Sequence, residues 1–182
     1  VQDFIATARR SRDLWYGSWM LSELSKAAAK EIADSGRRLI FPAITRSQEL
    51  AAGSNFNAPN KILAVTTDPP DRLATAVGAA IQRRLYELRD VAFNPLSKEP
   101  LFDRDLADKQ IEDLVEFYWV SVPFADDQGY AQARRVAEVL LSARKATRDF
   151  QPTLGDHRPK SSLDGTRESV IRETAYPAPN AS

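Results

Sequence analysis

The chain has 182 residues, enough for one domain with a sizeable core or for a small domain with tails. Its 25 Lys and Arg residues balance 25 Asp and Glu residues, so overall charge attracts it to neither nucleic acid nor an anionic membrane. No apolar run approaches the roughly 18 residues that span a bilayer, and we predict a cytoplasmic protein without membrane contact.

The first predicted element is helical. Residues 2–34 are rich in helix-forming residues and contain no proline, which predicts one long helix or a pair of helices. The apolar stripes before and after Gly17 fall on nearly opposite faces. Glycine costs about 1 kcal/mol inside a helix and serine favours caps, so we expect a kink or break at Gly17-Ser18. Gly36 is expected to close the second piece.

Two short strands and a helix follow. Leu39–Phe41 and Lys61–Thr67 have the apolar and β-branched content of strands. Apolar residues at spacings of three and four predict an amphipathic helix over residues 73–88, and Asn94-Pro95 ends it.

The remaining elements are a helix, a strand, a helix and a tail. A helix is predicted from about residue 103 to 114, followed by a buried strand over Phe117–Val122 and a helix over 127–150. Beyond Gln151 the chain is rich in proline, serine and charge, and we expect an extended, weakly ordered tail over 151–182.

This order of elements indicates an α+β fold. The sequence opens with Val1 and enters a helical pattern at once, so we expect a truncated start. One further strand before Val1 would give a β-α-β-β-α-β ferredoxin-like palm with an antiparallel sheet and added helices. We therefore assign residues 1–150 to a first palm domain that lacks its first strand, and residues 151–182 to a tail.

Three segments resemble a known family. The opening VQDFIATARRSRDLWYGSWMLSELSKAAAKEI resembles the first helix of the large subunit of type III-B CRISPR RNA-guided effector complexes. The segments LIFPA (39–43) and NKILAV (60–65) resemble its next two palm strands, and PKSSLDGTRES (159–169) resembles a later segment. The matching positions in the opening helix are Val1, Gln2, Phe4, Ile5, Arg9, Arg10, Arg12, Asp13, Leu14, Trp15, Gly17, Ser18, Leu21 and Ser22.

The resemblance implies a structural and regulatory part in antiviral defence. The family's whole subunit is similar to nucleotide cyclases and polymerases, and two palms bind ATP between them. The second palm carries a Gly-Gly-Asp-Asp turn that holds divalent metal and makes cyclic oligoadenylate. This chain has no such turn, and we interpret its adjacent pair Asp126-Asp127 as a helix start. We therefore expect no activity from this chain alone, and neither ATP nor metal held by it alone.

The resemblance also implies partners. These are the second palm of the same subunit and other subunits of the complex, with guide RNA and target RNA contacted indirectly. The alternative is a stand-alone ferredoxin-like module that binds a ligand or protein and is unrelated to CRISPR.

Four residues are candidates for a nucleotide site or an interface. Helical spacing places Arg12 in an apolar stripe, so its guanidinium needs either a carboxylate partner or a phosphate. Trp15 could stack on a base, although aromatic residues at helical spacing more often form core. At the expected break, Gly17 and Ser18 would offer free N–H groups to a phosphate, or they form only a kink.

A degenerate zinc position lies in the tail. Many relatives carry a Cys-x-x-Cys zinc half-site there, whereas Ser161 and Asp164 stand at the two cysteine positions of this chain. The chain has no cysteine, and its one histidine, His157, lies nearby. Serine is a poor zinc ligand, so we expect no metal at this place.

Overall fold

The computed structural model describes residues 10–95, 102–112, 114–147, 159–160 and 167–171. The chain divides into two compact units. The first unit comprises Val1–Val115 and Gly155–Ser182, and the second comprises Glu116–Leu154. Helices with a small antiparallel sheet make the fold compatible with the predicted α+β class.

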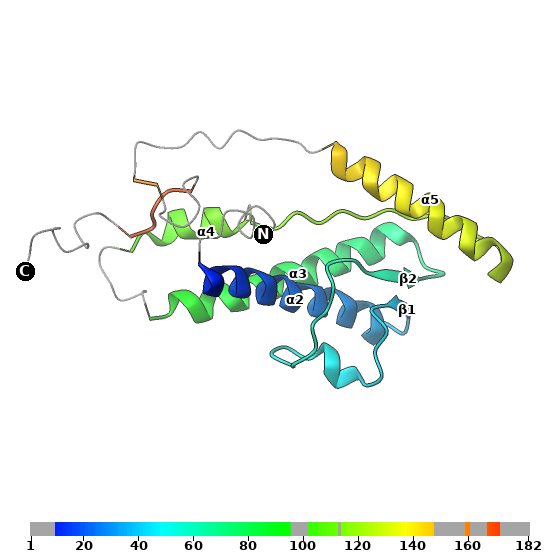
Figure 1. Ribbon diagram of the computed structural model, residues 1–182, viewed down its shortest axis with the longest axis horizontal. Helices are drawn as coiled ribbons and strands as arrows, with labels where there is room; N and C mark the ends of the chain where they lie inside the picture. Colours follow the sequence, from blue (N-terminus) through cyan, green and yellow to red (C-terminus); the bar gives the residue numbers. More distant parts are fainter. Residues whose placement is uncertain (1–9, 96–101, 113, 148–158, 161–166, 172–182) are drawn as a thin grey trace, which may run out of the picture. The chain divides into compact units, whose positions relative to one another are not determined.

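The first described element is α2 (Ser11–Asp34), which is one continuous helix (Figure 1). The predicted break at Gly17-Ser18 is therefore wrong. Gly17 is buried and lies on the same face as Met20 and Leu24, at spacings of three and four residues. Packing along that face outweighs the roughly 1 kcal/mol that a glycine costs inside a helix.

A two-stranded sheet follows α2. Gly36, at a φ of 75°, ends the helical segment as predicted. Strand β1 (Arg38–Phe41) then pairs antiparallel with β2 (Leu63–Val65), close to the two predicted strands. Arg38 stands opposite Val65, and the register shifts between Leu39 and Phe41. The other edge of β2 has no strand beside it in the described part of the chain.

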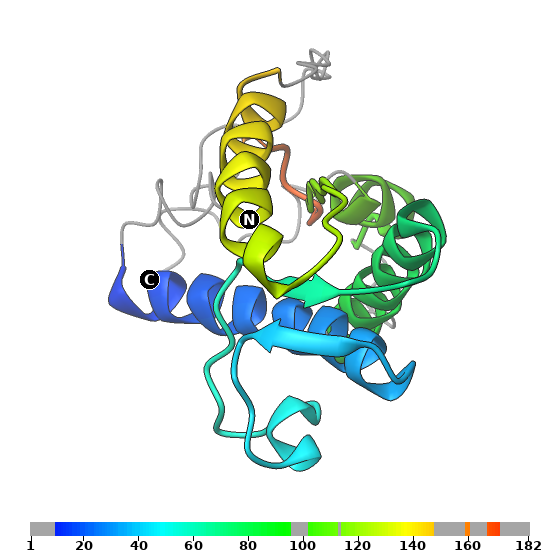
Figure 2. The ribbon, with the colours of Figure 1, turned by 90° about the vertical axis from the view of Figure 1, so that its right-hand side faces the viewer.

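The connection between the two strands, residues 42–62, contains the short 3-10 helix η1 (Ser47–Leu50). Leu50 and Ala58 are buried in the first unit. Both β1 and η1 contact α2, and Figures 1 and 2 show the sheet and η1 beside this helix. The connection thus contacts the helix through η1 and through residues 53–58.

Helix α3 (Pro70–Phe93) packs along α2 and closes the core of the first unit (Figure 1). Its buried positions confirm the amphipathic helix predicted over residues 73–88. Partly buried Leu39 and Ala64 of the sheet also pack against this core. The buried cluster consists of Met20, Leu24, Ala28, Ile32, Val77, Ile81, Leu85 and Leu88.

Helix α4 (Arg104–Glu112) is bordered by a segment from the end of the chain. Residues 167–171, predicted to be part of an extended and weakly ordered tail, are hydrogen-bonded to this helix and its start. Asp103 N donates to Val170 O at 2.8 Å, and Gln110 Nε2 donates to Glu168 O at 2.9 Å. Arg167 Nη1 donates to Gln110 O at 2.6 Å. The described residues of the tail are therefore docked.

The second unit contains α5 (Asp127–Ala146), which confirms the last predicted helix. The Asp126 side chain accepts from Gly129 N at 2.9 Å and caps α5, which confirms the pair Asp126-Asp127 as a helix start. Residues 117–122, predicted as a buried strand, form no ladder, and that prediction is wrong for this structure. In the expected palm topology the last strand pairs with the first, which would precede Val1.

Candidate functional site

An aromatic cluster marks the amino-terminal end of α2. The rings of Trp15 and Trp19 are stacked with their centroids 6.4 Å apart, and Tyr16 lies 5.6 Å from Trp19. Trp15 is 66 % exposed, and Leu14 beside it is also exposed. Trp15 and Tyr16 are therefore solvent-facing, whereas Trp19 is partly buried and packs against the core.

Arg12 lies on this exposed side of α2. Its side chain is 73 % exposed, and its Nε lies 3.5 Å from Asp13 Oδ1. We expected Arg12 in a partly buried stripe, and this expectation is wrong. The buried face of α2 instead includes its neighbour Asp13, together with Gly17 and Met20. The partner Asp13 is the more buried of the two, and its Oδ2 has no hydrogen-bond partner within the described residues.

Gly17 and Ser18 do not form the expected phosphate-binding helix start. Both lie inside α2, where backbone N–H groups are bonded to carbonyl groups of the preceding turn. Gly17 is buried and Ser18 is exposed. The structure thus brings Arg12, Trp15 and Ser18 to one end of α2 and leaves Gly17 against the core. Their assignment to a nucleotide site or interface stays a prediction.

A buried network of charges, which sequence reasoning missed, joins α2, α3 and the connection between the strands. The Glu23 carboxylate forms ion pairs with Lys26 in the same helix and with Arg84 of α3. The side chains of Glu23 and Lys26 are 0 % and 2 % exposed. Arg84 also forms an ion pair with Glu87, so two positive and two negative charges meet in this network.

The same network holds the backbone of the connection. Gly53 N donates to Glu23 Oε2 at 3.0 Å, and Lys26 Nζ donates to Ser54 O at 2.9 Å. In the same helix, next to Glu23, Ser22 Oγ accepts from Ala58 N at 2.9 Å. These contacts fix residues 53–58 on α2.

The ionisation of Glu23 follows from these contacts. Burial raises the pKa of Glu23, but hydrogen bonds from Lys26, Arg84 and Gly53 N–H outweigh it and leave the pKa below its ordinary 4.5. Glu23 is therefore an anion at neutral pH. The sequence showed only Glu and Lys at a spacing of three, which is typical of a solvated helix face.

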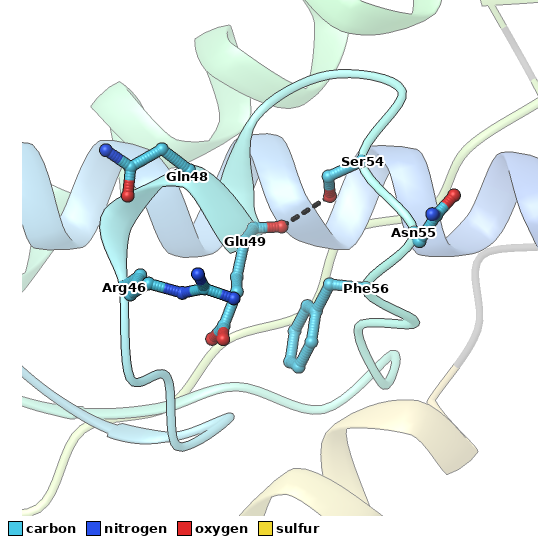
Figure 3. A pocket seen from close by; sticks show the side chains of 6 residues that line it. All are labelled: Arg46, Gln48, Glu49, Ser54, Asn55 and Phe56. Carbon is cyan, nitrogen blue, oxygen red and sulfur yellow. Dashed lines mark hydrogen bonds between the residues drawn. The ribbon is translucent and has the colours of Figure 1, made fainter.

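An open pocket of about 400 Å³ lies on the outer side of the connection (Figure 3). The Glu49 carboxylate accepts from Thr45 Oγ1 at 2.7 Å and from Thr45 N at 3.0 Å, and these bonds lower the pKa of Glu49. Ser54 Oγ donates to Glu49 O at 2.6 Å. Figure 3 shows the Phe56 ring on one side of the pocket and the Arg46 and Glu49 side chains on the other. The lining residues are Arg46, Gln48, Glu49, Ser54, Asn55 and Phe56.

The described residues show neither a group of metal ligands nor a membrane-spanning helix. Among the residues that the structure describes, no three His, Cys, Asp or Glu side chains are grouped so that they could hold a metal ion. The degenerate zinc positions Ser161 and Asp164, and His157, lie outside the described residues. No helix within the described ranges combines the length and the apolar character needed to cross a membrane.

Comparison with known proteins gives one match. Residues 1–90 match the family model described as CRISPR-associated protein Cmr2, N-terminal. This range includes α2, the β1–β2 sheet, η1 and most of α3, and hence the aromatic cluster, the charge network and the pocket. No curated protein and no solved structure matches the chain. Through residues 1–90, the chain belongs to the family of the amino-terminal region of Cmr2, the large subunit of the multi-subunit type III-B CRISPR effector complex.

Proposed function

We propose that this chain contributes one palm of an ATP-binding interface between two palms of the same subunit, and that it docks other subunits of the effector complex. The family supports an effector-subunit role. The observation that carries the finer proposal is the exposed surface of Trp15 and Arg12 at the end of α2. Exposed apolar surface in a subunit of a larger assembly favours an interface.

The architecture is consistent with half of a ferredoxin-like palm. The β1–β2 sheet lies on α2, and β2 offers an edge with no strand partner in the described part of the chain. An unpaired edge has backbone N–H and C=O groups that can bond to another strand. We propose that a strand of the longer subunit, preceding α2 in the chain, adds to this edge.

The described residues could contact the base and a phosphate of a nucleotide, but they offer no site for the accompanying metal ion. The Trp15 ring can stack on adenine, and the Arg12 guanidinium is exposed enough to meet a phosphate. No group of metal ligands occurs among the described residues. In the whole subunit, residues elsewhere would hold the divalent metal. The metal would stabilise the negative charge of the bound ATP phosphates.

Nucleotide affinity of the whole subunit tests this proposal. Trp15→Ala should weaken the binding of a non-hydrolysable ATP analogue, because a base–aromatic stack contributes about 1–3 kcal/mol, or roughly 5- to 150-fold. Arg12→Ala tests the proposed contact with a phosphate. Its matched control is Arg72→Ala, because Arg72 of α3 is exposed and lies outside the aromatic cluster. Equal affinities in all variants would contradict a nucleotide role for this surface.

The chain alone is proposed to be inactive toward ATP. It lacks the Gly-Gly-Asp-Asp turn, and Asp126 caps α5. Metal-dependent conversion of ATP by the purified chain, lost in Asp126→Ala or Asp127→Ala, would overturn this. The alternative of a module unrelated to CRISPR is not supported, because residues 1–90 match the Cmr2 family model.

A further inference from the structure

Helix α5 of the second unit has two apolar stripes, and one of them is covered. The segment that precedes α5 contacts this covered stripe, because the Phe124 and Tyr130 rings meet edge to face with their centroids 5.7 Å apart. The residues of the covered stripe are buried or partly buried, and they are Tyr130, Ala133, Ala137 and Leu141. This stripe is thus used inside the folded chain.

The second stripe of α5 is open to solvent. All of its residues are exposed, and spacings of three and four positions place them on one side of the helix: Val136, Val139, Leu140 and Ala143. Val139 is 69 % exposed. A surface helix needs only one apolar stripe to join its own core. A second stripe with this spacing is typical of a helix that packs against a further helix.

Arginine residues border the open stripe. Helical spacing places Arg135 along one side of it and Arg144 along the other, with Lys145 on the opposite side of the helix. Arg135 is exposed and forms no ion pair with another described residue. The acidic Glu138 lies away from the stripe, where its Oε1 is 3.4 Å from Arg134 Nε. The borders of the open stripe are therefore positively charged.

We propose that the open stripe docks an amphipathic helix of another subunit, whose own apolar stripe is bordered by Glu or Asp side chains. Those carboxylates would meet Arg135 and Arg144. A second copy of this chain fits poorly, because an antiparallel pair of α5 helices centred on the stripe would place Arg135 opposite Arg144. An anionic membrane also fits poorly, since the stripe has neither Trp nor Phe. The inference rests on the proposed docking of other subunits and is independent of the ATP interface.

The first test is binding of two synthetic helical peptides to the whole 182-residue chain, measured by fluorescence anisotropy. Both peptides have the 20-residue length of α5 and one leucine stripe, which is bordered by Glu in the first and by Lys in the second. The chain should bind the Glu peptide at least about tenfold more tightly. Val139→Ser should weaken that binding at least about fivefold. Val91→Ser is the matched control, because Val91 of α3 is 76 % exposed, and it should have no effect.

Charge reversal tests the borders of the stripe. Arg135→Glu should weaken binding of the Glu peptide and strengthen binding of the Lys peptide, each by about two- to fivefold. Lys145→Glu makes the same change of charge on the opposite side of α5, so it should alter neither affinity at about 0.15 M salt. Urea midpoints equal to that of the wild type would confirm that the variants are folded.

The natural partner is tested in the reconstituted effector complex, with a photo-crosslinking benzophenone side chain in place of Val139. The crosslink should join an acidic amphipathic helix of another subunit. A crosslink to a non-acidic segment of another subunit would overturn the proposed partner chemistry and leave subunit docking intact. The proposal is also overturned if the two peptides bind alike, if Arg135→Glu behaves like Lys145→Glu, or if the crosslink joins two copies of this chain. Binding to phosphatidylserine vesicles that is lost in Val139→Ser would assign the stripe to a membrane instead.

Discussion

The Lys26 ammonium donates to the backbone carbonyl oxygen of Ser54 at 2.9 Å, with the two residues 28 positions apart in the chain. Lys26 also forms an ion pair with Glu23, and its side chain is 2 % exposed. A lysine in the middle of a helix thus fixes the connection between two strands. The stability of the domain and the position of the pocket depend on the same buried charges.

Glu23→Gln should destabilise the chain by about 3–5 kcal/mol, because it leaves Lys26 and Arg84 buried without their shared anion. Asp34→Asn is the matched control, since Asp34 pairs with Lys30 in an exposed position of the same helix. That control should cost under about 0.5 kcal/mol. Urea unfolding followed by circular dichroism measures both, and equal midpoints would show that the network contributes little.

The Glu23 contribution should depend on pH. Its pKa in the folded chain is lowered from 4.5, so the stabilisation is fully present above that value and is lost as pH falls through the lower, folded value. Wild-type chain should therefore lose more stability below about pH 4.5 than Glu23→Gln does. Urea midpoints between pH 3 and 7 test this, and parallel curves would contradict the assignment.

Arg12→Ala should hardly change the stability of the chain. The Arg12 side chain is 73 % exposed, and an exposed Arg typically contributes under about 0.5 kcal/mol. Arg10 is also exposed, and Arg10→Ala should have the same small effect. Urea midpoints check this, and a loss confined to Arg12→Ala would show that the ion pair between Arg12 and Asp13 contributes more than an exposed pair normally does.

Asp126→Ala should weaken α5 by about 1 kcal/mol, because the bond that the Asp126 side chain accepts from Gly129 N is lost. Asp127, in the first turn, interacts only with the helix dipole, so Asp127→Ala should cost at most about 1 kcal/mol. Amide exchange along 127–133 measures the local stability. A greater effect of Asp127→Ala would show that the cap is misassigned.

Gln110→Ala should loosen residues 167–171 from α4. The Gln110 side chain donates to Glu168 O at 2.9 Å, so exchange at the amides of Asp103 and Ser169 should become faster. Lys109→Ala, at an exposed neighbouring position, serves as control and should not change it. Rapid exchange at these two amides in wild-type chain would contradict the docking of residues 167–171 on α4.

The sequence by itself predicted the elements whose local patterns are strong. The apolar spacing around Val77 and Leu85, the apolar and β-branched content of Lys61–Thr67 and the capping residue Asp126 each specify local structure through short-range chemistry. The opening motif also identified the family. These features depend on residues close together in the chain, so periodicity and cap chemistry suffice to find them.

Only the tertiary structure decided the rest. Helix α2 stays continuous because Gly17 lies in a packed face, and residues 117–122 form no strand because no partner strand is present in the described chain. Glu23 and Lys26 are buried because α3 and residues 53–54 cover them. The physical reason is that burial and strand pairing depend on residues distant in sequence, and no local pattern records them.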